Sequence, residues 1–192
     1  MRRDDIIVYM DMDLTTVDTD AGIVNRYNEE FHENLTSAGG WGHPNFTKCS
    51  EEWVTNVYRT PQFFKYLYPL PGAIDTMRMI HENARLIIAT QAFASAAPGK
   101  YWWLEKYAPF VENVIMLTTM GQTFISPNKS VLAEPPETRA FLMDDSPVSM
   151  SQFKGTKICF GDYTHNMGYV GIHLFNHNDV QRFFTNIFQE EE

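Results

Sequence analysis

The strongest indication of the fold is the sequence Ile6-Ile7-Val8-Tyr9-Met10-Asp11-Met12-Asp13-Leu14-Thr15. Its first half is a short run of β-branched and apolar residues, which is typical of a buried strand. Asp11 and Asp13 follow where that strand should end, and ligands of an open α/β sheet collect at the carboxyl ends of its strands. Burying two like charges is costly unless a partner such as a divalent cation neutralises them. The pair therefore indicates either a metal-assisted site or a solvated acidic turn.

The composition of the chain limits the classes of protein to consider. Its 192 residues are 44% hydrophobic, which suits one domain or a core domain with a small insertion. The net charge of −9 argues against a nucleic-acid-binding surface, although a metal and local cations could still hold a phosphate. Cys49 and Cys159 show neither a disulfide framework nor zinc spacing. With no apolar signal region or membrane-length run, we expect a cytoplasmic protein that binds neither nucleic acid polymers nor membranes.

Strand and helix patterns alternate along the rest of the chain. Helical periodicities separate the apolar runs, and this alternation implies a Rossmann-like α/β fold, a doubly wound parallel sheet with helices on both faces. We expect five further strands, at Arg85–Thr90, Val114–Leu117, Ala140–Met143, Ile158–Phe160 and Ile172–Phe175.

The segment from residue 17 to residue 70 carries no obvious core strand. Short helices are expected at 51–58 and after Thr60, and a proline-rich turn follows at Pro69–Gly72. We therefore expect residues 17–70 to form a small helical cap inserted after the first strand, and residues 1–16 and 71–192 to form the core domain. Apolar residues at every fourth position predict that the first cap helix ends near Gly39-Gly40: Ile23, Tyr27, Phe31 and Leu35.

Two later strands end in polar residues as the first one does. Thr90 and Gln91 end the second strand, and their hydroxyl and amide could bind phosphate oxygens, although a strand-end Thr more often caps local backbone. Asp144 and Asp145 end the fourth strand. Two carboxylate pairs at the ends of neighbouring strands are less easily accidental than one.

Convergence of Asp11, Asp13 and Asp144 would supply the hard oxygen ligands that Mg²⁺ prefers. Lys129 precedes the fourth strand and in most contexts would be a surface lysine. Beside an acidic, phosphate-handling site it becomes the natural cation to neutralise a nucleophile and a phosphate together. An Asp can accept a phosphoryl group while a second Asp serves as acid and base, which fits the opening pair.

This pattern resembles the haloacid dehalogenase superfamily of phosphohydrolases. The stretch 11–15 is similar to its first motif, Thr90 to the second, Lys129 to the third and Asp144-Asp145 to the fourth, in the same order and over nearly the whole chain. Finer features resemble the 5'(3')-deoxyribonucleotidase branch: Phe63-Phe64 with Pro69–Ala73, Trp103–Tyr107, Asn128–Val131 and Thr164-His165-Asn166.

The chain also departs from that branch. Leu14 stands where the branch usually has Gly, Gln91 where it usually has Ser, and Thr19 where it has an aromatic residue. Insertions stand at 120–127 and around Pro135-Pro136. These changes leave the hydrolytic core intact and bear on the choice of nucleobase.

The resemblance implies a Mg²⁺-dependent phosphomonoesterase, most closely a 5'-nucleotidase or 5'(3')-deoxyribonucleotidase that acts on (deoxy)nucleoside monophosphates. Asp11 would be the nucleophile that forms an aspartyl-phosphate, and Asp13 the acid and base. Mg²⁺ would be held by Asp11, the backbone carbonyl of Asp13 and Asp144, with Asp145 supporting these ligands. Hydrogen bonds to the phosphoryl oxygens would come from Thr90, Gln91 and Lys129.

The sequence says less about which residues would bind the part of the substrate that lies away from the phosphate. Trp41, Phe63 and Phe64 are candidates to stack on a nucleobase, and packing of the cap interior is the alternative for each. A phosphatase for phosphosugars or other small phosphomonoesters stays open, as does a homodimer. A non-catalytic binding or regulatory protein of this fold is the more distant alternative, and the filled catalytic positions argue against it.

Overall fold

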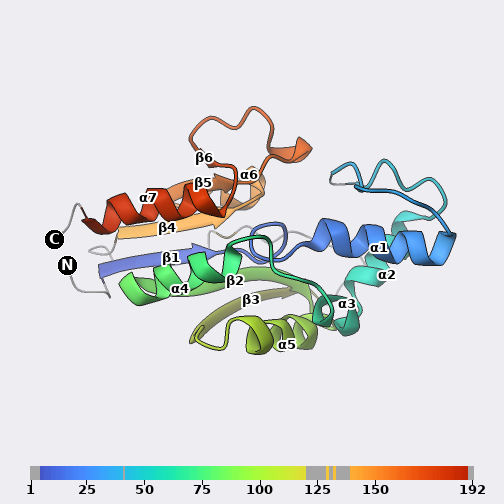
Figure 1. The fold of residues 1–192 in the computed structure, drawn as a ribbon, viewed down its shortest axis with the longest axis horizontal. Coiled ribbons are helices and arrows are strands. Elements are labelled where there is room, and N and C mark those ends of the chain that lie inside the picture. Colours follow the sequence, from blue (N-terminus) through green and yellow to red (C-terminus); the bar gives the residue numbers. More distant parts are fainter. Residues whose placement is uncertain (1–4, 41, 120–128, 130–131, 133–138, 190–192) are drawn as a thin grey trace.

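The fold is built on a parallel sheet, seen in a computed structural model that describes residues 5–40, 42–119, 129, 132 and 139–189. The six strands are β1 (Ile6–Met10), β2 (Arg85–Phe93), β3 (Asn113–Thr119), β4 (Arg139–Asp144), β5 (Thr156–Phe160) and β6 (Ile172–Leu174). They pair in the order β3-β2-β1-β4-β5-β6, and every pairing is parallel (Figure 1). The chain winds outward from central β1 on both sides, so the predicted doubly wound α/β fold is confirmed.

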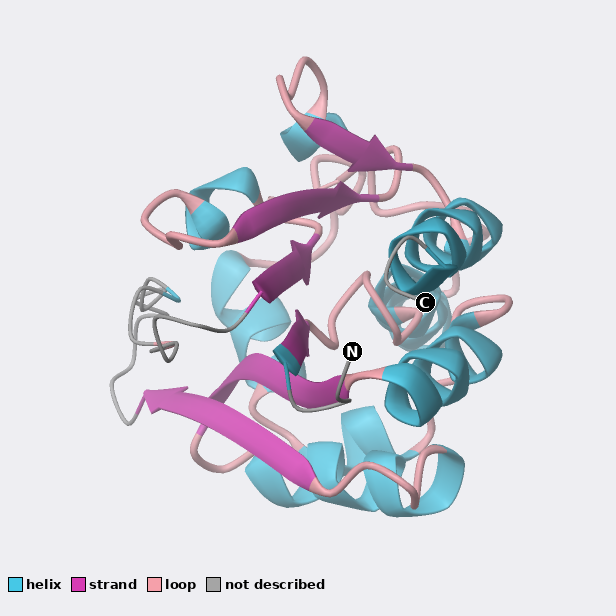
Figure 2. Cartoon of the chain, turned by 90° about the vertical axis from the view of Figure 1, so that its left-hand side faces the viewer, coloured by secondary structure: helices cyan, strands magenta, loops and turns pink. Residues whose placement is uncertain are grey.

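Alternate residues of the strands enter two separate cores. Ile6, Val8 and Met10 of β1 pack on one side of the sheet, and Ile7 and Tyr9 pack on the other. Figure 2 shows helices on both faces. The first face carries α4 (Ala73–Asn83), α5 (Ala97–Tyr107) and α7 (His177–Gln189), and the second carries α6 (Pro147–Met150). None of the helices in the described ranges combines the length and apolar character that a bilayer crossing requires.

Between β1 and α4 the chain forms helices beyond the carboxyl ends of the strands (Figure 1). They are α1 (Thr19–Phe31), α2 (Glu51–Tyr58) and α3 (Pro61–Lys65). This segment has a small core of its own, in which the rings of Tyr27 and Phe46 stack with centroids 4.2 Å apart. The two connections to the sheet run side by side, since the Leu70 N–H donates to the Thr16 carbonyl over 2.9 Å. We infer from these contacts a cap over residues 17–70.

The first cap helix ends earlier than its periodicity predicts. α1 stops at Phe31, and His32 adopts a left-handed φ of 53° while its N–H bonds to the Asn28 carbonyl. The Asn28 side chain donates to the Leu35 carbonyl over 2.8 Å and accepts from the Leu35 N–H over 2.9 Å. These bonds replace helical ones, so the prediction that the helix runs to Gly39-Gly40 was wrong.

The cap also contacts the core through α3 and α5. A Cβ atom added to Gly99 would lie 2.0 Å from the Pro61 carbonyl oxygen, so only glycine permits this approach of the two helices. The indole N–H of Trp103 donates to the Leu67 carbonyl over 3.2 Å. The end of the cap is therefore fixed directly on the helix that follows β2.

Candidate active site

The opening acidic motif forms the turn that follows β1. The Asp11 N–H donates to the Met143 carbonyl of β4 over 2.9 Å, so Asp11 still lies in the sheet. The Met12 carbonyl then accepts several backbone N–H groups of the next residues and closes the turn. Leu14 has a positive φ of 56°, a conformation that glycine adopts without strain, and the Tyr163 hydroxyl donates to its carbonyl over 2.8 Å. This turn gives the side chains of Asp11 and Asp13 different partners.

Asp11 belongs to a buried acidic cluster at the ends of β1 and β4. Carboxylate oxygens of Asp11, Asp144 and Asp145 lie within 4.8 Å of one another. Lys129 Nζ donates to Asp11 Oδ1 and to Asp144 Oδ2, in both cases over 2.6 Å. Asp145 has two further partners outside the cluster. His165 Nε2 lies 2.8 Å from its Oδ2, and the side-chain amide of Asn166 donates to its backbone carbonyl over 3.1 Å.

The charges of this cluster do not balance. Burial raises the pKa of Asp144, and burial together with the charges of Asp144 and Asp11 raises the pKa of Asp145. Burial disfavours the charged form of Lys129, but the carboxylates of Asp11 and Asp144 outweigh it and raise the lysine pKa. Three carboxylates beside one ammonium offer hard oxygen ligands and excess negative charge, so this donor set fits Mg²⁺.

Asp13 has a different cation as its partner. Lys100 of α5 has a side chain that is 0% exposed, and its Nζ donates to Asp13 Oδ2. The same ammonium donates to Thr90 Oγ1 over 2.7 Å and to the Gln91 carbonyl over 2.6 Å. Burial raises the pKa of Asp13 and Lys100 opposes that rise. A carboxyl group with a raised pKa is suited to donate a proton.

The structure therefore groups the predicted site residues around two lysines. Lys129 contacts Asp11 and Asp144, as the sequence predicts for a cation among carboxylates. Thr90 and Gln91 lie instead with Asp13, because Lys100 binds all three. The Asp13 carboxylate is outside the acidic cluster, where Asp145 takes its place. Binding of the metal by the Asp13 backbone carbonyl stays a prediction.

Sequence reasoning did not find Lys100. A lysine is almost always solvated, and this one reads as part of a helix ahead of Trp103. The available signal was its position: Lys100 precedes Trp103 and Leu104 by three and four residues, so it lies on the buried stripe of α5.

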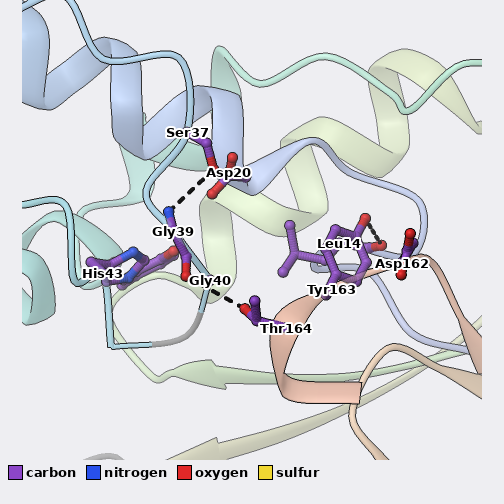
Figure 3. Close-up of a pocket in the computed structure, with 10 residues that line it drawn as sticks. Leu14, Asp20, Ser37, Gly39, Gly40, His43, Asp162, Tyr163 and Thr164 are labelled. Atoms are coloured by element: carbon purple, nitrogen blue, oxygen red, sulfur yellow. Dashed lines mark hydrogen bonds between the residues drawn. The ribbon is translucent and has the colours of Figure 1, made fainter. Parts of the chain in front are cut away.

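A cavity of about 210 Å³ opens between the cap and the core beside this turn (Figure 3). The core contributes Leu14 and Tyr163, and the cap contributes Asp20, Gly39 and His43. Thr164, which also lines the cavity, connects the core to the cap, because its hydroxyl donates to the Gly39 carbonyl over 3.4 Å. The cavity is therefore bounded by backbone and polar groups as well as by rings.

The three base-stacking candidates are placed differently. Trp41 lies outside the described residues. Phe64 is 3% exposed and belongs to the main core, with its ring centroid 4.9 Å from Lys100 Nζ. Phe63 lines a separate groove between α1, α2 and α3. Neither phenylalanine lines the cavity beside Leu14, and Phe64 packs in the main core. Base stacking by these candidates stays a prediction.

Replacing Phe64 by Ala tests this placement. We expect Phe64→Ala to lower the free energy of unfolding by about 3–5 kcal/mol, because a buried ring leaves a cavity behind. Tyr66→Ala is the matched control, since Tyr66 is 68% exposed in the same segment. Urea denaturation measures both variants. A Phe64→Ala protein of wild-type stability that loses activity only on nucleotides would show that the ring stacks on a base.

The fold and the order of the site residues define a class. An acidic pair after β1, a hydroxyl in β2, a lysine before β4 and a second acidic pair at the end of β4 follow one another in a doubly wound sheet, as in phosphohydrolases of the haloacid dehalogenase superfamily. β2 continues past Thr90 to Phe93, so the predicted end of that strand was wrong. More narrowly, the chain belongs to the family described as 5' nucleotidase, deoxy (pyrimidine), cytosolic type C protein, whose model matches residues 5–182. The protein is therefore a hydrolase of the phosphatase and nucleotidase class, and the predicted superfamily and branch are confirmed.

Individual relatives agree with the family. A Staphylococcus epidermidis protein provisionally named a 5'(3')-deoxyribonucleotidase is 27% identical over 188 residues, 94% of this chain and 96% of its own. A 5'(3')-deoxyribonucleotidase of Clostridium acetobutylicum is 26% identical over 163 residues, 82% of each chain. A provisionally assigned hydrolase of the superfamily from Bacillus subtilis, solved bound to magnesium, has a TM-score of 0.57 at 13% identity, and the match covers 95% of this chain and 99% of that one. This last likeness shows the shared fold.

Proposed function

We propose that the protein is a Mg²⁺-dependent phosphomonoesterase that hydrolyses (deoxy)nucleoside monophosphates through an aspartyl-phosphate. The observation that carries the proposal is that the two aspartates of one turn have different partners. Asp11 pairs with Lys129 in the acidic cluster, while Asp13, two residues later, pairs with Lys100 beside Thr90. Two carboxylates in different environments suit the two roles of nucleophile and proton donor.

In the first step an Asp11 oxygen attacks the phosphorus, and the phosphorus–oxygen ester bond breaks. Asp13 gives its proton to the departing alkoxide, which leaves as the nucleoside hydroxyl. In the second step water attacks the phosphorus of the aspartyl-phosphate and gives a proton to Asp13. Inorganic phosphate leaves, and the Asp11 carboxylate and protonated Asp13 are restored.

The remaining residues stabilise charge on the phosphoryl group. Lys129 donates to Asp11 and could turn a hydrogen toward the transferring phosphoryl oxygens, and the Thr90 hydroxyl and the Gln91 side-chain amide could donate to the same oxygens. Asp11, Asp144 and Asp145 would hold Mg²⁺, which when bound would draw negative charge from the phosphate and reduce its repulsion of the nucleophile. The magnesium in the Bacillus subtilis relative supports this choice of metal.

The choice of substrate rests on the family and on the names of the relatives, which favour nucleoside monophosphates. Phosphosugars or other small phosphomonoesters are the second candidate. They are favoured by the cavity lining, where Asp20, Asp162 and Thr164 offer hydrogen bonds, and by Thr19, which is buried where this branch has an aromatic residue. A cytoplasmic location and a homodimer stay predictions.

A phosphate-release screen tests the proposed function. The purified protein is assayed on deoxyribonucleoside and ribonucleoside monophosphates and on phosphosugars, first with Mg²⁺ and then after exhaustive chelation. We expect turnover of nucleoside monophosphates that disappears on chelation and returns with Mg²⁺, because the acidic cluster needs a divalent cation to balance its charge. Activity that survives chelation would contradict the metal dependence, and activity on phosphosugars alone would favour the second candidate.

Asp144→Asn tests the metal ligands separately. This variant keeps the shape of the side chain but removes one charge from the cluster, so half-maximal activity should require about tenfold or more Mg²⁺ than in the wild type. Asp75→Asn is the control, since Asp75 is exposed in the first turn of α4, outside the cavity and the acidic cluster. An unchanged Mg²⁺ requirement in Asp144→Asn would remove Asp144 from the ligand set.

A further inference from the structure

Lys100 is a buried charge at the site to which the proposed mechanism gives no role. Its side chain is 0% exposed, and Gly99, Trp103 and Leu104 of the same helix are buried around it. Burying an ammonium is unfavourable unless each of its hydrogens finds an acceptor. Its position inside the core therefore needs a reason beyond the packing of α5.

All three donors of Lys100 are already used. They go to Asp13 Oδ2, to Thr90 Oγ1 at 2.7 Å and to the Gln91 carbonyl at 2.6 Å. The Phe64 ring lies on the ammonium, with its centroid 4.9 Å from Nζ. Since no hydrogen is left for a phosphoryl oxygen, Lys100 acts on Asp13 and Thr90 and not on the substrate.

Its contact with Asp13 fixes one carboxylate oxygen and leaves the other available. Asp13 Oδ2 accepts from Lys100, whereas Asp13 Oδ1 is buried and finds no hydrogen-bond partner within the described ranges. A carboxyl group held at one oxygen cannot rotate toward Asp11 and Asp144 without breaking that bond. The other oxygen is then the one that can hold a proton for the ester oxygen of a substrate.

Its contact with Thr90 sets the direction of the hydroxyl hydrogen. Because Thr90 Oγ1 accepts from Lys100, the hydroxyl hydrogen has to point elsewhere. Among the described residues its acceptor is the Gln91 carbonyl at 3.4 Å, which is a long bond to an oxygen that Lys100 already occupies. A phosphoryl oxygen would be a better acceptor for this hydrogen.

We propose that Lys100 is a positioning residue that fixes the Asp13 carboxyl group and the Thr90 hydroxyl relative to each other. One side chain thereby aligns the proton donor with the ester oxygen and the hydroxyl donor with the phosphoryl oxygen of the same substrate. The proposal rests on the proposed function, in which Asp13 protonates the leaving group. It predicts that loss of Lys100 affects substrates according to their leaving groups.

The test compares Lys100→Met and Lys100→Arg on a deoxyribonucleoside monophosphate and on 4-nitrophenyl phosphate, whose leaving group scarcely needs a proton. General acid catalysis typically contributes about 10²–10⁴-fold, so Lys100→Met should lower kcat on the nucleotide about 100-fold. The loss of kcat on the aryl ester should be smaller than this by a factor of about ten or more. Lys100→Arg should recover part of the nucleotide activity, because it restores a cation. Lys106→Met, an exposed lysine on the same helix, should match the wild type on both substrates.

A double variant covers the case in which Lys100→Met leaves Asp13 as a buried unpaired charge and does not fold. Asp13→Asn with Lys100→Met removes both charges, and circular dichroism and thermal unfolding check its fold. Loss of the Thr90 contact should cost both substrates the same small factor, which is the loss that Lys100→Met shows on the aryl ester. If Lys100 also acts through Asp13, the double variant should lose on the nucleotide only that small factor beyond Asp13→Asn alone. Equal losses of the two substrates in Lys100→Met, or a double variant whose nucleotide loss is the full product of the two single losses, would overturn the role of Lys100 while wild-type activity keeps the proposed function. A wild type inactive on every phosphomonoester would overturn both.

Discussion

Asp11→Asn should abolish hydrolysis of every phosphomonoester, the largest effect expected from any single substitution in this chain. The amide cannot form an aspartyl-phosphate, and it also removes one charge from the cluster with Asp144 and Asp145. We expect a loss of at least about 10⁵-fold in kcat, the scale seen when a nucleophile is removed from a cooperating catalytic set. Phosphate release with Mg²⁺ measures it on a nucleotide and on an aryl phosphate.

The control for Asp11→Asn is Asp75→Asn, which removes an exposed carboxylate from the first turn of α4. Lys129 keeps Asp144 as a partner when Asp11 is neutral, so the variant should stay folded. Thermal unfolding of both variants separates chemistry from stability. Residual turnover of Asp11→Asn on either substrate, after exclusion of wild-type contamination, would require a nucleophile other than Asp11.

The parts of the fold that the sequence predicts are those specified by local patterns. Apolar runs such as Ile6–Met10 have one stable environment, the interior of a parallel sheet, and the turns between them are marked by glycine, proline and acidic residues. The end of α1 was predicted wrongly because the Asn28 side chain binds the Leu35 backbone. Such a bond depends on one rotamer, and the periodicity of apolar residues carries no information about it.

The site is predictable to the extent that strand ends determine it. Asp11 and Asp144 meet because β1 and β4 are paired in parallel, with Met10 opposite Met143. The direction of the Asp13 side chain depends instead on the turn with Leu14 at positive φ. No strand pattern contains that information, so the sequence placed the Asp13 carboxylate with the acidic cluster.

Lys100 and Phe64 show the second limit of the sequence. Both depend on the close approach of α3 and α5 at Gly99, which is a contact between the cap and the core. From the sequence, Lys100 has no assigned role, and Phe64 is a candidate either to stack on a base or to pack in the cap interior. In the structure the ring lies on the ammonium and both side chains are buried.

Asp13→Asn should slow phosphoryl transfer from a nucleoside monophosphate by about 10²–10⁴-fold and slow transfer from 4-nitrophenyl phosphate much less. The asparagine oxygen can still accept from Lys100, and its backbone is unchanged, but the side chain has no proton to give to an alkoxide. Single-turnover rates of the first step, measured with both substrates and with Asp75→Asn as the control, test this expectation. The aspartyl-phosphate should also persist, since Asp13 can no longer take a proton from the attacking water. Equal slowing of both substrates in that step would show that Asp13 binds or orients the phosphate and that another group protonates the leaving oxygen.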